Sequence, residues 1–203
     1  MNKLDPRNIY DDLHQIPELG FEEFKTSAYL ADKLEAMGYK VTRNIGGTGV
    51  IGEIKGSEPG PVMMLRADMD ALPFLIDGEK KNIHACGHDA HSAMLLAAAS
   101  ELVGKVKRGT LRILFQQGEE TLKGALAVID AGVIEDVDIA LGLHIRPVQD
   151  IAYGEMSPAV RHASSTFVNV VINGLSSHGA RPHLGVNLSL IHISEPTRRV
   201  VIS

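Results

Sequence analysis

The residue types best suited to chemistry lie in one short stretch, HACGHDAH, which spans residues 84–91. It holds three histidines, an aspartate and the chain's only cysteine. Thiolate, imidazole and carboxylate groups are the usual protein ligands of zinc and related divalent ions. Cys86 and His88 are two residues apart, so a single turn can direct both toward one site. The stretch therefore suggests a metal site whose other ligands come from elsewhere in the chain.

Further candidate ligands follow apolar segments that are predicted to be strands. Asp68 and Asp70 follow VMMLR, His144 follows IALGL, and the pair Glu119–Glu120 follows LRILFQQ. Ligands of open α/β sheets bind beyond the carboxyl ends of the strands, so we expect these side chains to meet at one edge. One of two adjacent carboxylates can bind a metal while its neighbour stays free as a general base for a water molecule.

Hydrophobic patterning predicts the elements that carry these residues. Apolar strands are expected over 60–68, 109–117 and 137–144, with helices over 89–105 and 122–132 between them. This β-α-β-α-β order with short connections predicts an α/β fold with a mainly parallel, right-handed sheet and flanking helices. An additional strand is expected over 49–56.

One more helix is predicted near the N-terminus, over 21–37. Helical spacing places one apolar stripe along it, made of Phe21, Phe24, Leu30, Leu34 and Met37. Gly38 is placed to end the helix. In the helix over 89–105, Asp89 is placed to act as the N-cap.

Each candidate ligand also has an ordinary structural interpretation. A lone cysteine is commonly a small buried hydrophobe, and an acidic pair commonly lies at a solvated helix N-terminus. His84 and His91 are interpreted as supporting or neutral. A non-catalytic module in which Cys86, His88 and His144 hold a structural ion is the main alternative. The shared sheet edge and the adjacent glutamates favour a catalytic metal site over it.

Composition excludes several classes of function. The net charge is −5 and the pI is about 6.0, and no basic run exceeds two residues, so neither nucleic acid nor an anionic membrane is an expected partner. The N-terminus is too polar for a signal peptide, and no apolar run approaches a membrane span. A single cysteine favours the reducing cytoplasm.

Six motifs occur in the order found in one family of dinuclear metallopeptidases and amidohydrolases: HQIPELGFEE, LRADMDALP, HACGHDAH, FQQGEE, GLHI and HGARPH. The chain resembles this family, which includes carboxypeptidase G, the aminoacylases and succinyl-diaminopimelate desuccinylase, over residues 10–187. It is most similar to the branch of hippurate hydrolase, N-acetyldiaminopimelate deacetylase and the indole-acetyl-amino-acid hydrolases. The usual QPAEE is QQGEE here, which keeps both acids.

The resemblance implies hydrolysis of the amide bond of N-acyl amino acids with two divalent ions, either zinc, manganese or cobalt. It implies that Cys86 bridges the metals and that His88, Glu120 and His144 complete the ligands of this segment. Glu119 would be the general base. Two further carboxylates, Asp70 and Asp89, would support the ligands from behind. A metallo-aminopeptidase or dipeptidase of the same family is the alternative activity.

The resemblance also implies two domains and a homodimer. Residues 1–162 would be the N-terminal part of the catalytic domain, and residues 163–187 would begin an inserted α+β dimerisation domain. The sequence pattern itself predicts strands over 150–156 and 164–183. From that domain His178 would stabilise an oxyanion in a neighbouring active site. Arg181 and His183 would bind the substrate carboxylate.

The last segment, 188–203, does not fit the family pattern. Residues 188–198, LSLIHISEPTR, read as the translation of a transposase-type sequencing adaptor, so we expect this tail to be non-native. His192 is then no ligand, and the chain is an incomplete, inactive fragment of an enzyme. The alternative is a divergent helix start, against which Pro196 argues.

Overall fold

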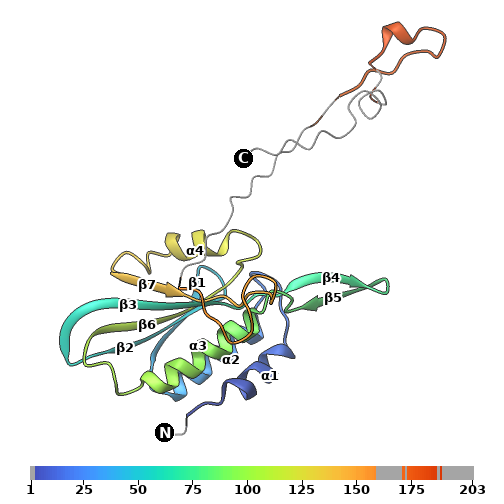
Figure 1. Cartoon of the computed structure of the whole chain (residues 1–203). Coiled ribbons are helices and arrows are strands. Elements are labelled where there is room, and N and C mark those ends of the chain that lie inside the picture. The colour runs from blue at the N-terminus through green and yellow to red at the C-terminus, as the bar shows by residue number, and fades with distance from the viewer. Residues whose placement is uncertain (1–2, 159–170, 172, 187, 189–203) are drawn as a thin grey trace. The chain divides into compact units, whose positions relative to one another are not determined.

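The computed structural model describes residues 3–158, 171, 173–186 and 188 (Figure 1). The chain divides into two compact units, Met1–Glu155 and Met156–Ser203, and each has its own architecture. In the described part of the chain, no helix is long and apolar enough to cross a membrane.

The first unit is built on a five-stranded sheet with the order β1-β2-β6-β3-β7. The strands are β1 (Lys40–Ile45), β2 (Gly49–Lys55), β3 (Glu58–Asp68), β6 (Arg108–Gln116) and β7 (Ile139–Gly142). β6, β3 and β7 run parallel, which confirms the predicted β-α-β-α-β unit. β1 and β2 extend the sheet as antiparallel strands beside β6, so the sheet as a whole is mixed.

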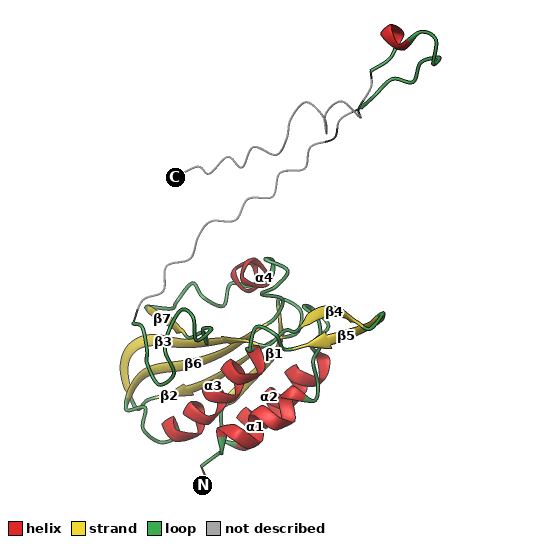
Figure 2. Cartoon of the chain, turned by 45° about the vertical axis from the view of Figure 1, so that its right-hand side comes forward, coloured by secondary structure: helices red, strands yellow, loops and turns green. Residues whose placement is uncertain are grey.

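Helices cover both faces of this sheet (Figures 1 and 2). On one face lie α1 (Pro6–His14), α2 (Phe24–Ala36) and α3 (His88–Leu102), and α4 (Gly124–Asp130) lies on the other. The larger core packs α1, α2 and α3 against the sheet, with Leu13, Leu34 and Phe115 fully buried. Burial of each such large apolar side chain contributes about 1.5–3 kcal/mol to folding. The two covered faces explain why β3 and β6 contain uninterrupted apolar runs, over 62–65 and 113–115.

Two details of the helix predictions are wrong. In α2, Leu30 and Leu34 are buried as predicted, but Phe24 is 68% exposed and Phe21 lies outside the helix with φ 67°. Asp89 is not the N-cap of α3, because Gly87 takes that position in the left-handed conformation. The Asp89 carboxylate instead lies within the first turn, where it accepts the backbone N–H of Ala90 and contacts His14.

A β-hairpin that was not predicted connects β3 to α3. Its strands β4 (Leu72–Ile76) and β5 (Glu79–Ile83) pair antiparallel from Leu72–Ile83 to Ile76–Glu79. Asp77 and Gly78 form the turn with φ 51° and 81°, as the Asp-Gly sequence favours in two-residue hairpins. The hairpin returns the chain to the sheet edge, so that the stretch 84–88 lies near the end of β3.

The predicted strand over 150–156 is wrong. These residues form turns, with backbone hydrogen bonds such as Glu155 N–H to the carbonyl of Ala152, and Gly154 adopts φ 86°, which interrupts an extended chain. Of the strands expected over 164–183, residues 164–170 and 172 lie outside the described residues. The described remainder of the second unit has an isolated bridge between Leu175 and Val186 and the short 3-10 helix η1 (Pro182–Leu184).

Candidate metal centre

The predicted ligands of the first unit meet at one edge of the sheet. β3, β6 and β7 end at Asp68, Gln116 and Gly142, and the loops that follow them converge with the start of α3. Three groups of side chains lie close enough to hold a metal ion among the described residues. These groups are Cys86–His88–His144, His88–Glu119–Glu120 and Asp68–His88–His91. His88 belongs to all three groups.

His88 is fully buried, and its hydrogen bonds determine which ring nitrogen is free. Nδ1 lies 2.9 Å from the carbonyl oxygen of Asp70 and 3.1 Å from its Oδ1. Both are acceptors, so Nδ1 carries the proton and donates it, and Nε2 presents its lone pair. Nε2 lies 3.9 Å from Oε1 of Glu120 and 4.0 Å from Oε2 of Glu119. This is the orientation of a metal-binding histidine held by a carboxylate behind it.

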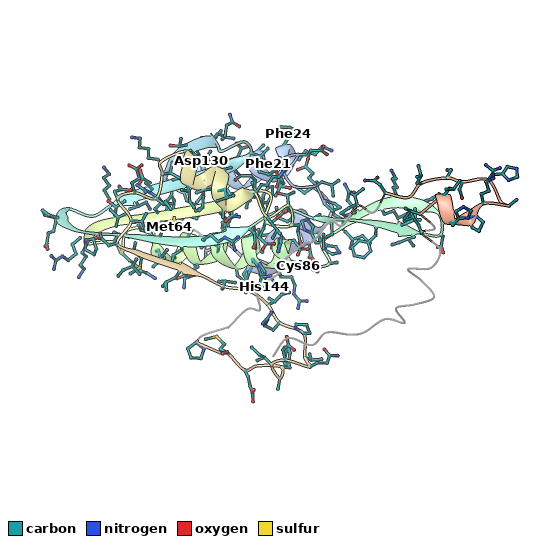
Figure 3. The ribbon with its side chains drawn as sticks, turned by 90° about the horizontal axis from the view of Figure 1, so that it is seen from above. Phe21, Phe24, Met64, Cys86, Asp130 and His144 are labelled. Atoms are coloured by element: carbon teal, nitrogen blue, oxygen red, sulfur yellow. The ribbon has the colours of Figure 1, made fainter. Side chains whose placement is uncertain are left out.

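His144 is oriented in the same manner. Its Nδ1 lies 2.6 Å from the carbonyl oxygen of Ile145 and therefore donates to it. Its Nε2 is left facing Sγ of Cys86 at 3.5 Å, and Figure 3 shows these two residues side by side. Burial, and then the carboxylate of Glu120, raise the pKa of the Cys86 thiol to about 12. The thiol therefore keeps its proton until a cation displaces it.

The two glutamates differ in their surroundings. Oε1 of Glu120 is buried and has no hydrogen-bond partner among the described residues. The Glu119 side chain is the more exposed, at 38% against 22%. Burial, and then the negative charge of Asp68, raise the pKa of Glu119 despite the opposing effect of His88. Glu120 is thus placed like a ligand and Glu119 like a free carboxylate at the rim.

The donor set fits divalent cations. Nε2 of His88, like Oε1 of Glu120, is buried without a hydrogen-bond partner among residues 3–158, 171, 173–186 and 188. An unpaired buried polar atom costs about 1–3 kcal/mol, and a metal ion would satisfy both atoms at once. Burial lowers the pKa of His88, but the hydrogen bond to Asp70 and the charge of Asp68 outweigh this and raise it. The pocket therefore favours positive charge.

A buried carboxylate from the N-terminal segment supports the acidic loop and was missed by sequence reasoning. Glu23 is fully buried and accepts hydrogen bonds from the backbone N–H of Gly118 at 2.8 Å and from the hydroxyl of Thr48. Burial raises its pKa, although both hydrogen bonds oppose the shift. Gly118 immediately precedes Glu119, so Glu23 holds the start of the loop that carries both glutamates. The only sequence feature that pointed to Glu23 was its position as the last residue of the motif HQIPELGFEE.

Asp68 is a fully buried carboxylate of the site, at the end of β3. Its carboxylate lies 2.8 Å from the guanidinium of Arg66, 2.8 Å from Nδ1 of His91 and 3.7 Å from Nε2 of His88. Burial opposes its ionisation, but the hydrogen bond from His91 and the charge of Arg66 hold the pKa of Asp68 well below its usual range. His91, for which the sequence suggested a supporting or neutral role, therefore contacts a carboxylate of the site directly.

The remaining predicted site residues are not part of this cluster of the first unit. Asp89 contacts His14, and none of the three possible metal groups includes it. His178, Arg181 and His183 belong to the second unit, where the backbone N–H of Arg181 donates to the carbonyl of His178. Their roles stay predictions. His192 lies outside the described residues.

Comparison with known proteins agrees with this geometry. The family model described as "Peptidase family M20/M25/M40" matches residues 64–198, which is more than half of the chain. The chain belongs to the M20 peptidase family. The match includes most of 188–203, so the adaptor origin of that tail stays a prediction. Reading the genomic locus by an independent method would test it, and finding the same codons in native DNA would refute it.

Proteins with similar sequences come from bacteria, an archaeon and a plant. The putative amidohydrolase YhaA of Bacillus subtilis is 38% identical over 182 residues, covering 84% of this chain and 46% of that protein. Hippurate hydrolase of Campylobacter jejuni is 38% identical over 183 residues, covering 86% of this chain and 48% of that protein. The crystal structure of Bacillus subtilis YXEP, "a Dinuclear Metal Binding Peptidase from M20 Family", superimposes with a TM-score of 0.63 at 37% identity. The superposition covers 70% of this chain and 42% of that one. The chain spans about half the length of the curated relatives it matches.

Proposed function

We propose that this protein is part of a metal-dependent amidohydrolase that cleaves the amide bond of N-acyl amino acids. The observation that carries the proposal is a pair of buried atoms, Nε2 of His88 and Oε1 of Glu120, which lie 3.9 Å apart and have no hydrogen-bond partner in the described part of the chain. Cys86 and His144 flank the pair, and Glu119 lies free beside it. The names of YhaA and hippurate hydrolase support an amide substrate.

In this proposal Cys86, His88, Glu120 and His144 would hold two divalent ions, either zinc, manganese or cobalt. Divalent ions at such sites supply Lewis acidity that polarises a carbonyl and activates water. Two ions are supported by the overlap of two ligand groups at His88 and by the similarity to YXEP, a dinuclear metal-binding peptidase.

Side chains of the protein carry out proton transfer, orient a ligand and bind the substrate. Glu119 accepts a proton from the attacking water and returns it to the leaving amine nitrogen, for which its raised pKa is suited. Asp70 holds His88 in the tautomer that leaves Nε2 free. In a neighbouring active site, His178 would stabilise the oxyanion that forms on the amide oxygen, and Arg181 and His183 would bind the substrate carboxylate.

The proposal extends to assembly and location. We infer a homodimer formed through the domain that begins at residues 163–187, acting on small molecules in the cytoplasm, with no nucleic-acid or membrane partner. Light scattering of the complete gene product tests the assembly. A monomer at assay concentration would contradict it.

A substrate panel tests the activity. The complete reading frame from the genomic locus is purified, stripped with a chelator and reloaded separately with zinc, manganese or cobalt. N-acetyl, N-succinyl, N-benzoyl and indole-acetyl amino acids are then compared with unblocked dipeptides. We expect metal-dependent release of the free amino acid from acylated substrates. Preferential cleavage of dipeptides would favour the peptidase alternative, and metal binding without any hydrolysis would favour the non-catalytic module.

A further inference from the structure

The hydrogen bonds of His91 define which tautomer its neutral ring adopts. His91 is fully buried in the first turn of α3, and its Nε2 lies 2.9 Å from the backbone nitrogen of Ile145. A backbone N–H can only donate, so Nε2 of His91 accepts and carries no proton. The proton of the neutral ring is then on Nδ1, which donates to Oδ1 of Asp68 at 2.8 Å. Both ring nitrogens are fully used by protein partners.

The carboxylate that receives this hydrogen bond is itself fixed. Asp68 is the last residue of β3, and its other oxygen accepts from the guanidinium of Arg66 at 2.8 Å. The hydroxyl of Ser92, one residue beyond His91, donates to the backbone carbonyl of Asp68 at 2.9 Å. The first turn of α3 is therefore joined to the end of β3 at two points, and the imidazole of His91 has little freedom to turn.

The opposite side of His91 holds the loop that carries His144. β7 ends at Gly142, so His144 lies beyond the regular strand, and its side chain is at an exposed position. The next residue, Ile145, is held by its N–H bond to His91 and by contact of its side chain with Gly87. The rings of His91 and His144 are 4.3 Å apart between centroids.

We propose that His91 is a positioning residue that presents His144 to the metal centre and is not itself a metal ligand. The chain of contacts runs from Arg66 through Asp68 and His91 to the N–H of Ile145. The group Asp68–His88–His91 is then no metal site, since His91 has no lone pair left to offer. The inference rests on the proposed function in one respect, the role of His144 as a ligand.

Two substitutions separate the two hydrogen bonds of His91. In His91→Asn the amide group lies near the former Nδ1, so it can donate to Asp68 but cannot reach the N–H of Ile145. In His91→Gln the amide oxygen lies near the former Nε2 and can accept from Ile145, while the donor to Asp68 is lost. His14→Asn is the control, because the hydrogen bond of His14 is made to Asp89, which lies on the same helix as His91 but outside the chain of contacts from Arg66 to Ile145.

Nuclear magnetic resonance of the full chain, metal-free and loaded with ¹¹³Cd²⁺, tests the proposal. Long-range ¹H–¹⁵N spectra should show His91 with a protonated Nδ1 and a bare Nε2 in both states. Couplings between ¹¹³Cd and ¹⁵N should appear at His88 and His144. A cadmium coupling at either nitrogen of His91, or a proton on its Nε2, would overturn the proposal even if neither variant folds.

Cadmium affinity of the variants gives the second readout. His91→Asn should bind cadmium about 10- to 100-fold more weakly, as is typical when a group behind a ligand is lost. His91→Gln and His14→Asn should bind close to the level of the unsubstituted chain, and exchange of the Ile145 amide proton should quicken only in His91→Asn. Equal weakening in His91→Asn and His91→Gln would contradict the role of the Ile145 bond. Because none of these measurements uses hydrolysis, failure of the amidohydrolase activity would leave them standing.

Discussion

Asp70 lies behind His88 and fixes the direction of its imidazole: Oδ1 of Asp70 is 3.1 Å from Nδ1, on the side away from the proposed metals. The other carboxylate oxygen of Asp70 accepts the backbone N–H of Glu120 at 2.9 Å. One buried carboxylate thus holds two proposed ligands that are 32 positions apart in the sequence.

Asp70→Asn should weaken metal binding while the fold persists. The asparagine amide would face the N–H of Glu120 or Nδ1–H of His88 with a donor, so one of the two hydrogen bonds is lost. We expect metal affinity to fall by about 10- to 100-fold, measured by competition with a chromophoric chelator. Asp77→Asn in the turn of the β4–β5 hairpin is the matched control, since asparagine tolerates a positive φ. Unchanged affinity in Asp70→Asn would contradict the role given to Asp70.

Glu23→Gln should change how stability depends on pH. The pKa of Glu23 is raised in the folded state, so its contribution to stability is full at low pH and is lost as the pH rises through the folded-state pKa. Glutamine stays neutral at every pH. The free energy of unfolding of Glu23→Gln relative to the unsubstituted chain should therefore increase from about pH 4 to about pH 8, above the ordinary glutamate pKa.

Urea denaturation at a series of pH values measures this difference. Glu22→Gln, at the neighbouring exposed position, controls for the loss of one negative charge. If the difference in unfolding free energy between Glu23→Gln and the unsubstituted chain stays constant or shrinks as the pH rises, ionisation of the buried Glu23 does not destabilise the fold.

Gly87→Ala should disturb the site as well as the backbone. Gly87 and Gly104 both have positive φ, 84° and 74°, and alanine at either costs about 1–2 kcal/mol of backbone strain. A methyl group at 87 would also collide with the side chain of Ile145, whereas nothing lies within 4 Å of one at 104. We expect Gly87→Ala to lose more stability in urea than Gly104→Ala, and to bind cadmium more weakly. Equal cadmium affinity in the two variants would contradict the packing of Ile145 on Gly87.

Local patterns predicted much of the fold. Apolar runs mark β2, β3, β6 and β7, and an alanine-rich stretch marks α3; the alternation of strands and helices then predicts that β3, β6 and β7 are parallel. The sheet edge follows from that arrangement, which is why the sequence alone predicts that Cys86, His88, Glu119, Glu120 and His144 meet.

Other parts of the site depend on contacts between distant residues that leave no local pattern. Glu23 and Gly118 are 95 positions apart, and His91 and Ile145 are 54 apart. Phe24 fits the spacing of the apolar stripe but is exposed, because helical spacing alone does not determine which residues pack against the sheet. The N-terminal helix α1 was not predicted, although Asp5 as N-cap followed by Pro6 in the first turn is a usable signal.

The most direct test of the proposed mechanism compares Glu119→Gln with Glu120→Gln in the complete gene product, measuring bound metal and amide hydrolysis on the same samples. Glu119→Gln should retain its metal and lose hydrolysis by about 10²- to 10⁴-fold, as expected when a general base is removed. Glu120→Gln should lose metal together with activity. Full hydrolysis in Glu119→Gln, or full metal content in Glu120→Gln, would contradict the division of roles between the two glutamates.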